Sequence, residues 1–217
     1  MSVSRYYPVY LKLQGKNVVV IGGGKVAERK ILSLLEAGAS VSVISPTLTR
    51  SLELLSSEKK IIHIPDTFRE EQLQGVFLVM STTDRPEVNA RVAQKAKALG
   101  ILSNIADDPD ACDFIVPSVI ERGDLVISVS TGGNSPALAK KIREELETQY
   151  GEEYAKFCQL LGAVRSKVLD EIDDGQRRAE LFRKLVDSDI LRLLKEGRDD
   201  LVSVKIEELL ADGGARS

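Results

Sequence analysis

A short apolar run that ends in glycines limits the fold of this chain more than any other feature. Residues 17–21, NVVVI, are rich in β-branched side chains and lead directly into GGGKVA. Such a run is typical of a strand that is buried on both faces of a parallel sheet. Further apolar runs stand at 41–45, 61–64, 76–81 and 101–105, and helical patterns separate them. This alternation, with short connections, predicts an α/β fold with a mainly parallel, doubly wound sheet.

The glycines after the first predicted strand match a dinucleotide-binding fingerprint. Gly22, Gly24 and Ala27 form G-x-G-x-x-A between a strand and a helix. In this pattern the first glycine permits a tight turn, the second lets the backbone approach a pyrophosphate, and the small third residue allows close helix packing. Amide groups at the helix start, where Lys25 and Val26 lie, also favour a phosphate. We therefore predict a Rossmann-type dinucleotide site rather than a purely structural glycine turn.

The second predicted strand bears on which dinucleotide is bound. The acidic residue expected about 20 positions after the glycines is absent, because this strand ends in Ser45, Pro46 and Thr47. A hydroxyl and backbone groups can still bond a ribose, so these three residues are predicted to contact the cofactor. No arginine stands at the strand end to favour a 2′-phosphate, although Arg50 is close. The sequence therefore favours NAD+ over NADP+.

Two threonines follow the fourth predicted strand. Thr82 and Thr83 should lie at the carboxyl edge of the sheet, where a dinucleotide crosses the crevice, and we expect both to contact the cofactor. A second interpretation of the same turn is equally compatible with the sequence. In it, Asp84 simply caps the next helix and Pro86 occupies its first turn.

The pattern changes in the second half of the chain. Residues 113–130 contain two apolar runs around ERGD, which predict an antiparallel hairpin or a pair of edge strands. A long helix should cover roughly 136–150, and the rest of the chain has helical periodicity. These changes divide the chain into a Rossmann-type domain at 1–112, a small α+β region at 113–150 and a helical region at 151–217.

Composition narrows the classes of function. The net charge of -3 does not suggest a nucleic-acid binder. No apolar run approaches the ~20 residues of a membrane span, so no membrane partner is expected. Cys112 and Cys158 fit neither metal-ligand spacing nor a disulfide framework, so we expect no metal site and a reduced, cytoplasmic location. The single histidine, His63, stands within a predicted strand and is interpreted as structural.

Four motifs together resemble one enzyme family. They are P-V-Y-L-x-L at 8–13, G-G-G-x-V-A-x-R-K at 22–30, N-x-x-D at 104–107 and S-T-G-G-x-S-P at 130–136. The set resembles the precorrin-2 dehydrogenases of sirohaem biosynthesis. That family includes stand-alone bacterial enzymes, yeast-type dehydrogenase/ferrochelatases and the N-terminal part of bacterial sirohaem synthases. The resemblance is dense over residues 6–150 and looser beyond them.

The resemblance implies a function and a catalytic residue. It implies oxidation of precorrin-2, a tetrapyrrole, to sirohydrochlorin with NAD+, by a homodimer in which 113–150 is the dimerisation region. It implies that Asp107 is the general base or a chelation-assisting residue. From position alone, the favoured interpretation is that Asp107 and Asp108 form a turn before Pro109.

Two alternatives to a plain dehydrogenase remain at this stage. Some members of the family also insert Fe2+ into sirohydrochlorin, and the motifs do not separate the two groups. A non-catalytic nucleotide-sensing module is the other alternative. It predicts an acidic ribose contact where this chain has Ser45, and it offers no reason for the S-T-G-G-x-S-P motif.

The S-T-G-G-x-S-P loop is the predicted substrate-binding element. Ser135 is a good N-cap and Pro136 a good first helical residue, so the loop should present backbone amides at the positive end of a helix. A substrate with many carboxylates would bind there, helped by the charges of Lys140, Lys141 and Arg143. The alternative is a structural turn whose basic residues pair with glutamates four positions on. The predicted contacts are Thr131, Gly132, Gly133, Asn134 and Ser135.

Overall fold

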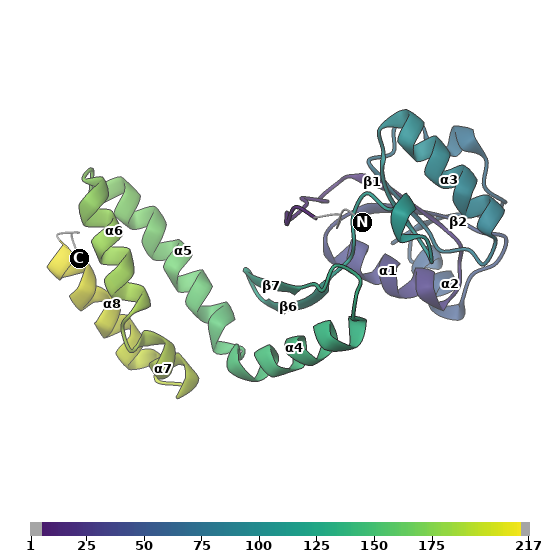
Figure 1. The fold of residues 1–217 in the computed structure, drawn as a ribbon. Helices are drawn as coiled ribbons and strands as arrows, with labels where there is room; N and C mark the ends of the chain where they lie inside the picture. Colours follow the sequence, from purple (N-terminus) through teal and green to yellow (C-terminus); the bar gives the residue numbers. More distant parts are fainter. Residues whose placement is uncertain (1–5, 214–217) are drawn as a thin grey trace. The chain divides into compact units, whose positions relative to one another are not determined.

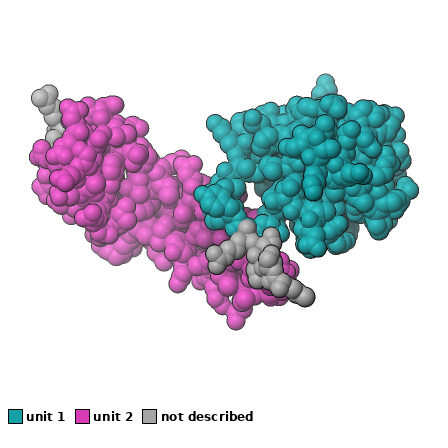
Figure 2. Space-filling model, turned by 45° about the horizontal axis from the view of Figure 1, so that its top comes forward, with its two compact units in different colours: residues 1–116 teal, residues 117–217 magenta. Residues whose placement is uncertain are grey.

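The computed structural model of the chain describes residues 6–213 (Figure 1). Residues 1–5 and 214–217, at the outer ends of the predicted Rossmann-type and helical regions, lie outside the described part. The chain divides into two units, residues 1–116 and residues 117–217, which Figure 2 shows in different colours.

A five-stranded parallel sheet with the order β3-β2-β1-β4-β5 forms the centre of the first unit. The predicted parallel, doubly wound sheet is therefore confirmed. Consecutive strands run outward from β1 to β3, and the chain then returns to the other side of β1 for β4 and β5. Such a reversal leaves a crevice between the loops that follow β1 and β4. The strands are β1 (Asn17–Ile21), β2 (Ser40–Ile44), β3 (Ile62–Ile64), β4 (Leu78–Ser81) and β5 (Leu102–Ile105).

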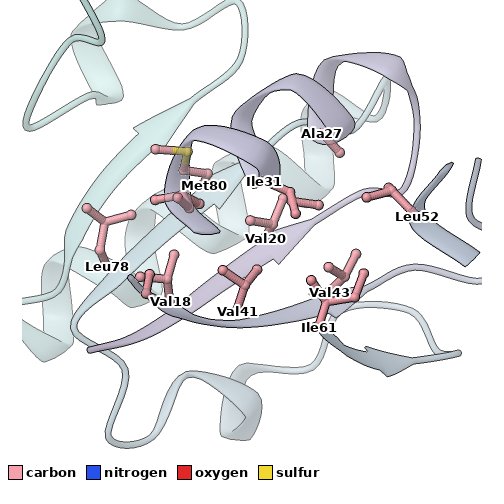
Figure 3. Close-up of a cluster of buried hydrophobic side chains, with 12 residues drawn as sticks. Val18, Val20, Ala27, Ile31, Val41, Val43, Leu52, Ile61, Leu78 and Met80 are labelled. Atoms are coloured by element: carbon pink, nitrogen blue, oxygen red, sulfur yellow. The ribbon is translucent and has the colours of Figure 1, made fainter. Parts of the chain in front are cut away.

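Helices cover both faces of this sheet, each over its own buried cluster. On one face, Ile31 of α1 packs with Val20 and Val43 of the strands and with Leu52 of α2 (Figure 3). On the other face, α3 packs its apolar residues against the opposite side chains of β1 and β4. The helical elements are α1 (Lys25–Glu36), α2 (Arg50–Ser57), α3 (Pro86–Leu99) and the short 3-10 helices η1 (Glu70–Leu73) and η2 (Pro109–Ala111).

One residue of α1 departs from the apolar face that the sequence predicts. The helical spacing of Val26, Ile31, Leu34 and Leu35 predicts that all four lie on one face, but Val26 is 47% exposed. The buried stripe runs instead through Ala27, Ile31 and Leu34, in steps of four and three residues. Val26 precedes that stripe by one position, which turns it about 100° around the helix axis. It therefore lies at the exposed start of the helix, beside the glycine loop.

A hairpin followed by helices makes up the second unit. Strands β6 (Ser118–Arg122) and β7 (Leu125–Val129) pair antiparallel, which confirms the predicted hairpin around ERGD. Helices α4 and α5 contact this hairpin, and α5 to α8 enclose a separate apolar core. No helix in residues 6–213 is long and apolar enough to cross a bilayer. The helices are α4 (Pro136–Gln149), α5 (Glu153–Glu171), α6 (Gly175–Val186), α7 (Ile190–Lys195) and α8 (Asp199–Gly213).

The core of the helical bundle allows a first prediction. Leu185 of α6 is 1% exposed, so Leu185→Ala should lower the free energy of unfolding by about 2–5 kcal/mol through lost burial and a residual cavity. Val186 is the next residue of α6 and is 55% exposed, so Val186→Ala is the matched control. Urea denaturation followed by circular dichroism would measure both. Equal losses for the two variants would contradict the described packing.

Candidate dinucleotide-binding and catalytic site

The three glycines after β1 have three different environments. Gly22 has a φ of 108°, and a Cβ on it would lie 2.7 Å from the Thr82 hydroxyl oxygen. A Cβ on Gly23 would lie 2.2 Å from the Thr47 carbonyl oxygen. Gly24 has no such neighbour within 4 Å. The first two positions therefore close the loop, and Gly24 leaves room on its open side for the backbone to approach a ligand.

Gly23 is a residue that sequence reasoning missed. The fingerprint assigns no role to the position between its first two glycines, although three glycines in a row were a visible signal. In the structure, the Gly23 carbonyl accepts a bond from the Thr49 amide at 3.0 Å. Gly23 thereby joins the glycine loop to the loop between β2 and α2, which carries the predicted ribose contacts.

The loop after β2 is held mainly by its own hydrogen bonds. Ser45 is buried, and its hydroxyl donates to the Thr47 carbonyl oxygen at 2.7 Å. The His63 ring nitrogen Nε2 donates to the Ser45 carbonyl oxygen at 2.9 Å, a structural role in keeping with its place in β3. Pro46 and Thr47 are exposed. Pro46 and Thr47, rather than the Ser45 hydroxyl, are therefore the solvent-exposed residues of this loop, although the Thr47 carbonyl oxygen is bonded to Ser45 and lies against Gly23.

An acidic side chain lies next to this loop, although it comes from α1 rather than from β2. The Glu28 carboxylate accepts a hydrogen bond from the Thr49 hydroxyl at 2.6 Å. Hydrogen bonds from Thr49 and Ser51 hold the pKa of Glu28 below its usual value. Sequence reasoning did not single out Glu28, because the contact depends on how α1 and the start of α2 pack together.

Thr82 and Thr83 lie at the carboxyl edge of β4, beside the glycine loop. The Thr82 amide and hydroxyl both donate to the Ile21 carbonyl oxygen, at 2.8 and 2.9 Å. The Thr83 hydroxyl donates to Asn89 Oδ1 at 2.7 Å, and Asn89 Nδ2 returns a bond to the Thr83 carbonyl oxygen at 3.1 Å. The buried Asn89, which sequence reasoning also missed, therefore fixes the conformation of this turn.

The alternative role for Asp84 as a helix cap is wrong. Arg85 occupies the N-cap position of α3 and makes no side-chain cap bond, while Pro86 is at the start of the helix as expected. The hydrogen bonds between Thr83 and Asn89 order this turn without any contribution from Asp84.

Asp107 follows β5 at the same edge of the sheet. Ile21, Ser81 and Ile105, the last residues of β1, β4 and β5, are in register. At about 4.8 Å between neighbouring strands, Ile21 and Ile105 are roughly 10 Å apart. Asp107 is exposed and has a φ of 61°, a left-handed conformation that aspartate tolerates better than most residues. Its carboxylate makes no hydrogen bond within residues 6–213.

The neighbouring aspartates have structural partners instead. Asp108 accepts a hydrogen bond from the Ala111 amide at 3.3 Å and caps η2. Asp113 accepts bonds from the Ser103 amide and hydroxyl, each at 2.9 Å. The turn interpretation therefore applies to Asp108, whereas the carboxylate of Asp107 remains available for chemistry.

The 131–135 loop belongs to the second unit and has the predicted cap. The Ser135 hydroxyl accepts from the Leu138 amide at 3.2 Å, and Pro136 begins α4. Several amides of this loop already have acceptors. Gly132 N donates to the Ser130 hydroxyl at 3.0 Å, Asn134 N to the Thr131 carbonyl at 3.1 Å and Ser135 N to the Thr131 hydroxyl at 3.0 Å.

The amides that remain available are fewer than the sequence predicts. In the described part of the chain, the amides of Thr131, Gly133 and Ala137 have no acceptor, and of these three residues only Gly133 and Ala137 are exposed. Gly133 has a φ of 87°. Any anion site in this loop therefore depends mainly on the amides of Gly133 and Ala137.

The basic residues of α4 are paired, as one of the two interpretations predicted. Lys140 lies 3.7 Å from Glu144, and Lys141 lies 3.8 Å from Glu145. Arg143 forms an ion pair with Glu147. These glutamates offset much of the positive charge, so the amides rather than the lysines are the stronger feature for anion binding.

Two observations on the described residues concern the binding of a dinucleotide and of a metal ion. The open side of Gly24 and the start of α1 suit a dinucleotide pyrophosphate. No group of three or more metal-ligating side chains occurs in residues 6–213.

Comparisons with known proteins agree with this geometry. A family model described as putative NAD(P)-binding matches residues 9–118, and one described as sirohaem biosynthesis protein central matches residues 122–149. A siroheme synthase of Pseudoalteromonas translucida is 34% identical over 206 residues, which are 95% of this chain and 44% of that protein. Siroheme synthase 1 of Aeromonas salmonicida is 38% identical over 186 residues, 86% of this chain and 40% of that protein.

A solved structure of a related protein matches nearly all of this chain. It is that of SirC, a precorrin-2 dehydrogenase, with a TM-score of 0.75 and 28% sequence identity, and the match covers 97% of this chain and 100% of that one. This chain thus spans less than half the length of the curated siroheme synthases it matches, but the full length of SirC. The chain belongs to the family formed by precorrin-2 dehydrogenases and the N-terminal regions of sirohaem synthases.

Proposed function

We propose that this chain oxidises precorrin-2 to sirohydrochlorin with NAD+. One observation supports this proposal most strongly. The dinucleotide-binding glycine loop around Gly24 and the unbonded carboxylate of Asp107 lie at the same edge of the sheet. When bound, the nicotinamide supplies the hydride acceptor. The substrate loses one hydride and one proton, and Asp107 accepts that proton as the general base. The likeness to a precorrin-2 dehydrogenase over its full length supports this substrate.

The preference for NAD+ over NADP+ is part of this proposal. No arginine stands at the end of β2, and the ionised Glu28 carboxylate lies against the same loop through Thr49. A 2′-phosphate there would bring two negative charges close together, whereas a ribose hydroxyl would not. Pro46 and Thr47 are exposed and available to contact that hydroxyl.

An anaerobic assay tests the proposed reaction directly. Purified protein is mixed with precorrin-2 and NAD+, and sirohydrochlorin is followed by its absorbance. Turnover is expected with NAD+ and should be much slower with NADP+. A complete lack of turnover with both would overturn the proposal. Adding Fe2+ to the product would test the insertion activity that the family resemblance leaves open.

We propose that the 131–135 loop and the start of α4 bind carboxylates of the substrate through the amides of Gly133 and Ala137. Gly133→Ala would strain the left-handed backbone and move one of these donors. One lost bond to a charged group corresponds to roughly a tenfold rise in KM for precorrin-2. The affinity for NAD+ should not change.

A second glycine supplies the control for this variant. Gly197 has a φ of 70° and, like Gly133, no atom within 4 Å of an added Cβ. Gly197→Ala should cause comparable backbone strain and leave both KM values unchanged. A Gly133→Ala enzyme with normal KM for precorrin-2 would contradict the role of this loop.

We further propose that the enzyme is a cytoplasmic homodimer that associates through residues 113–150. The family resemblance implies this region, and apolar side chains of its hairpin, such as Val119, Ile127 and Val129, are only partly buried within one chain. Multi-angle light scattering should give about twice the chain mass of 23.8 kDa. A mass of one chain at micromolar concentration would overturn this part of the proposal.

A further inference from the structure

The segment that carries Asp107 leaves the sheet and returns to it within a few residues. We call residues 106–112 the Asp107 loop. Asp113, just after the loop, bonds back to Ser103 of β5 through its amide and its carboxylate. The Cys112 sulfur accepts from the Ile105 amide at 3.1 Å. The C-terminal end of the loop is therefore tied to β5 at two neighbouring residues, Cys112 and Asp113.

A third tie lies under the loop and runs through Asn104. This side chain is buried, and its Nδ2 donates to the Phe114 carbonyl oxygen at 3.0 Å. That bond sets the orientation of the amide, so Oδ1 faces α1. There it accepts a hydrogen bond of 2.6 Å from Lys30 Nζ. A helix on one face of the sheet is thus bonded to the strand that ends at the Asp107 loop.

The environment of Lys30 is unusual for a lysine. The residue is only partly exposed, and no carboxylate of the described residues lies within ion-pair distance of its ammonium group. Burial and the nearby charge of Arg29 lower the pKa of Lys30. An aliphatic side chain at this position would avoid the cost of desolvating a charge. The packing of α1 alone therefore gives no reason for a lysine here.

We propose that Lys30 is a positioning residue for the oxidation of precorrin-2. Its ammonium group holds Asn104, and Asn104 in turn holds the return of the chain after the Asp107 loop. The Asp107 carboxylate is thereby held in position at the carboxyl edge of the sheet, where it accepts the proton that the substrate releases. The kinetic consequence of this inference rests on the proposed function, whereas the ordering of the loop does not.

The direct test is Lys30→Met, which keeps the aliphatic stem and removes the bond to Asn104. Displacement of a catalytic group by about 1 Å costs on the order of 10²-fold in rate, so kcat should fall by up to that factor. KM for NAD+ and for precorrin-2 should not change. Lys30→Arg retains a charged donor and should restore most of kcat. Arg29→Met removes a charge from the adjacent, exposed residue of α1 and should leave kcat unchanged.

A double-mutant cycle shows whether Lys30 acts through Asn104. Asn104→Leu removes all three hydrogen bonds of the side-chain amide, to Lys30, Phe114 and Cys112, so it should lower kcat at least as much as Lys30→Met. The double variant should be no slower than Asn104→Leu alone, because both changes break the same chain of contacts. Additive losses would overturn the proposed route through Asn104.

Hydrogen exchange in the absence of any substrate supplies the readout that does not depend on activity. Lys30→Met should speed exchange of amides in the Asp107 loop and leave those of β1 and β2 protected. Unchanged exchange in the loop would overturn the inference, even if the wild type oxidises precorrin-2 as proposed. Faster exchange across the whole sheet would also overturn it, because Lys30 would then serve general stability. If the wild type shows no turnover but Lys30→Met shows the expected exchange pattern, the proposed function would be overturned. The role of Lys30 in ordering the Asp107 loop would then still hold.

Discussion

An Asp107→Asn enzyme should oxidise precorrin-2 about 10²- to 10⁴-fold more slowly than the wild type, the range for loss of a general base. Asparagine cannot accept the proton, yet it tolerates the left-handed conformation that φ = 61° requires. The backbone of the loop should therefore be preserved, and the melting temperature and the affinity for NAD+ should remain unchanged. Single-turnover absorbance measurements with saturating NAD+ would give the rate of the chemical step.

Asp110 provides the matched control for Asp107. It is an exposed aspartate of the same loop, in the first turn of η2, and has no assigned role in the site. Asp110→Asn makes the same change of charge a few residues away and should leave kcat within a factor of about two. Normal turnover by Asp107→Asn would remove Asp107 as the base. Equal losses in the two variants would indicate a general effect of charge instead.

Gly23→Ala should have the largest effect on the cofactor site. The added Cβ would lie 2.2 Å from the Thr47 carbonyl oxygen, which is a backbone atom and cannot simply rotate away. The loop after β2 must therefore move, and the bond between Thr49 and Gly23 must lengthen or break. Forcing extra volume into such a contact costs typically about 1–3 kcal/mol. We expect lower stability without cofactor and more than tenfold weaker NAD+ binding.

Gly24→Ala tests whether an added methyl group weakens NAD+ binding by contact with the ligand alone, without a steric clash inside the protein. No atom lies within 4 Å of a Cβ at this position, and its φ of -85° suits any residue. The variant should melt at the wild-type temperature and still bind NAD+ more weakly, because the methyl group occupies the side open to the pyrophosphate. Differential scanning fluorimetry and calorimetric titration would measure the two effects. Normal NAD+ affinity in Gly24→Ala would contradict the proposed approach of the backbone.

Much of the fold follows from local patterns in the chain. The β-branched run of β1, the apolar spacing of α3 and the residues of the ERGD hairpin each indicate their element without help from distant residues. The errors came where several local solutions compete. Asp84 is a reasonable cap by residue type, but the turn is ordered by Thr83 and the buried Asn89. Val26 is apolar, yet it lies one helical position away from the buried stripe.

The candidate site was predictable only in part. Gly22 and Gly24 were recognisable because a turn and a close approach of the backbone leave a mark at fixed spacing. The roles of Gly23 and Lys30 depend on partners far away in sequence. A side chain at position 23 would collide with the Thr47 carbonyl oxygen. Lys30 donates a hydrogen bond to Asn104, which lies 74 positions further along the chain. Three consecutive glycines mark position 23 in the sequence, but a single sequence does not show which distant residue Gly23 or Lys30 contacts.

The amino-acid sequence by itself determined the order of strands and helices, the dinucleotide fingerprint and the position of Asp107 after a strand. Hydrophobic periodicity and the conformational needs of glycine are local properties, and local properties can be read along a chain. Only the tertiary structure decided which carboxylate remained unbonded at the sheet edge, which amides of the 131–135 loop were left available, and which lysine reaches β5. Hydrogen bonds and steric contacts of this kind depend on the distances between segments, and packing sets those distances.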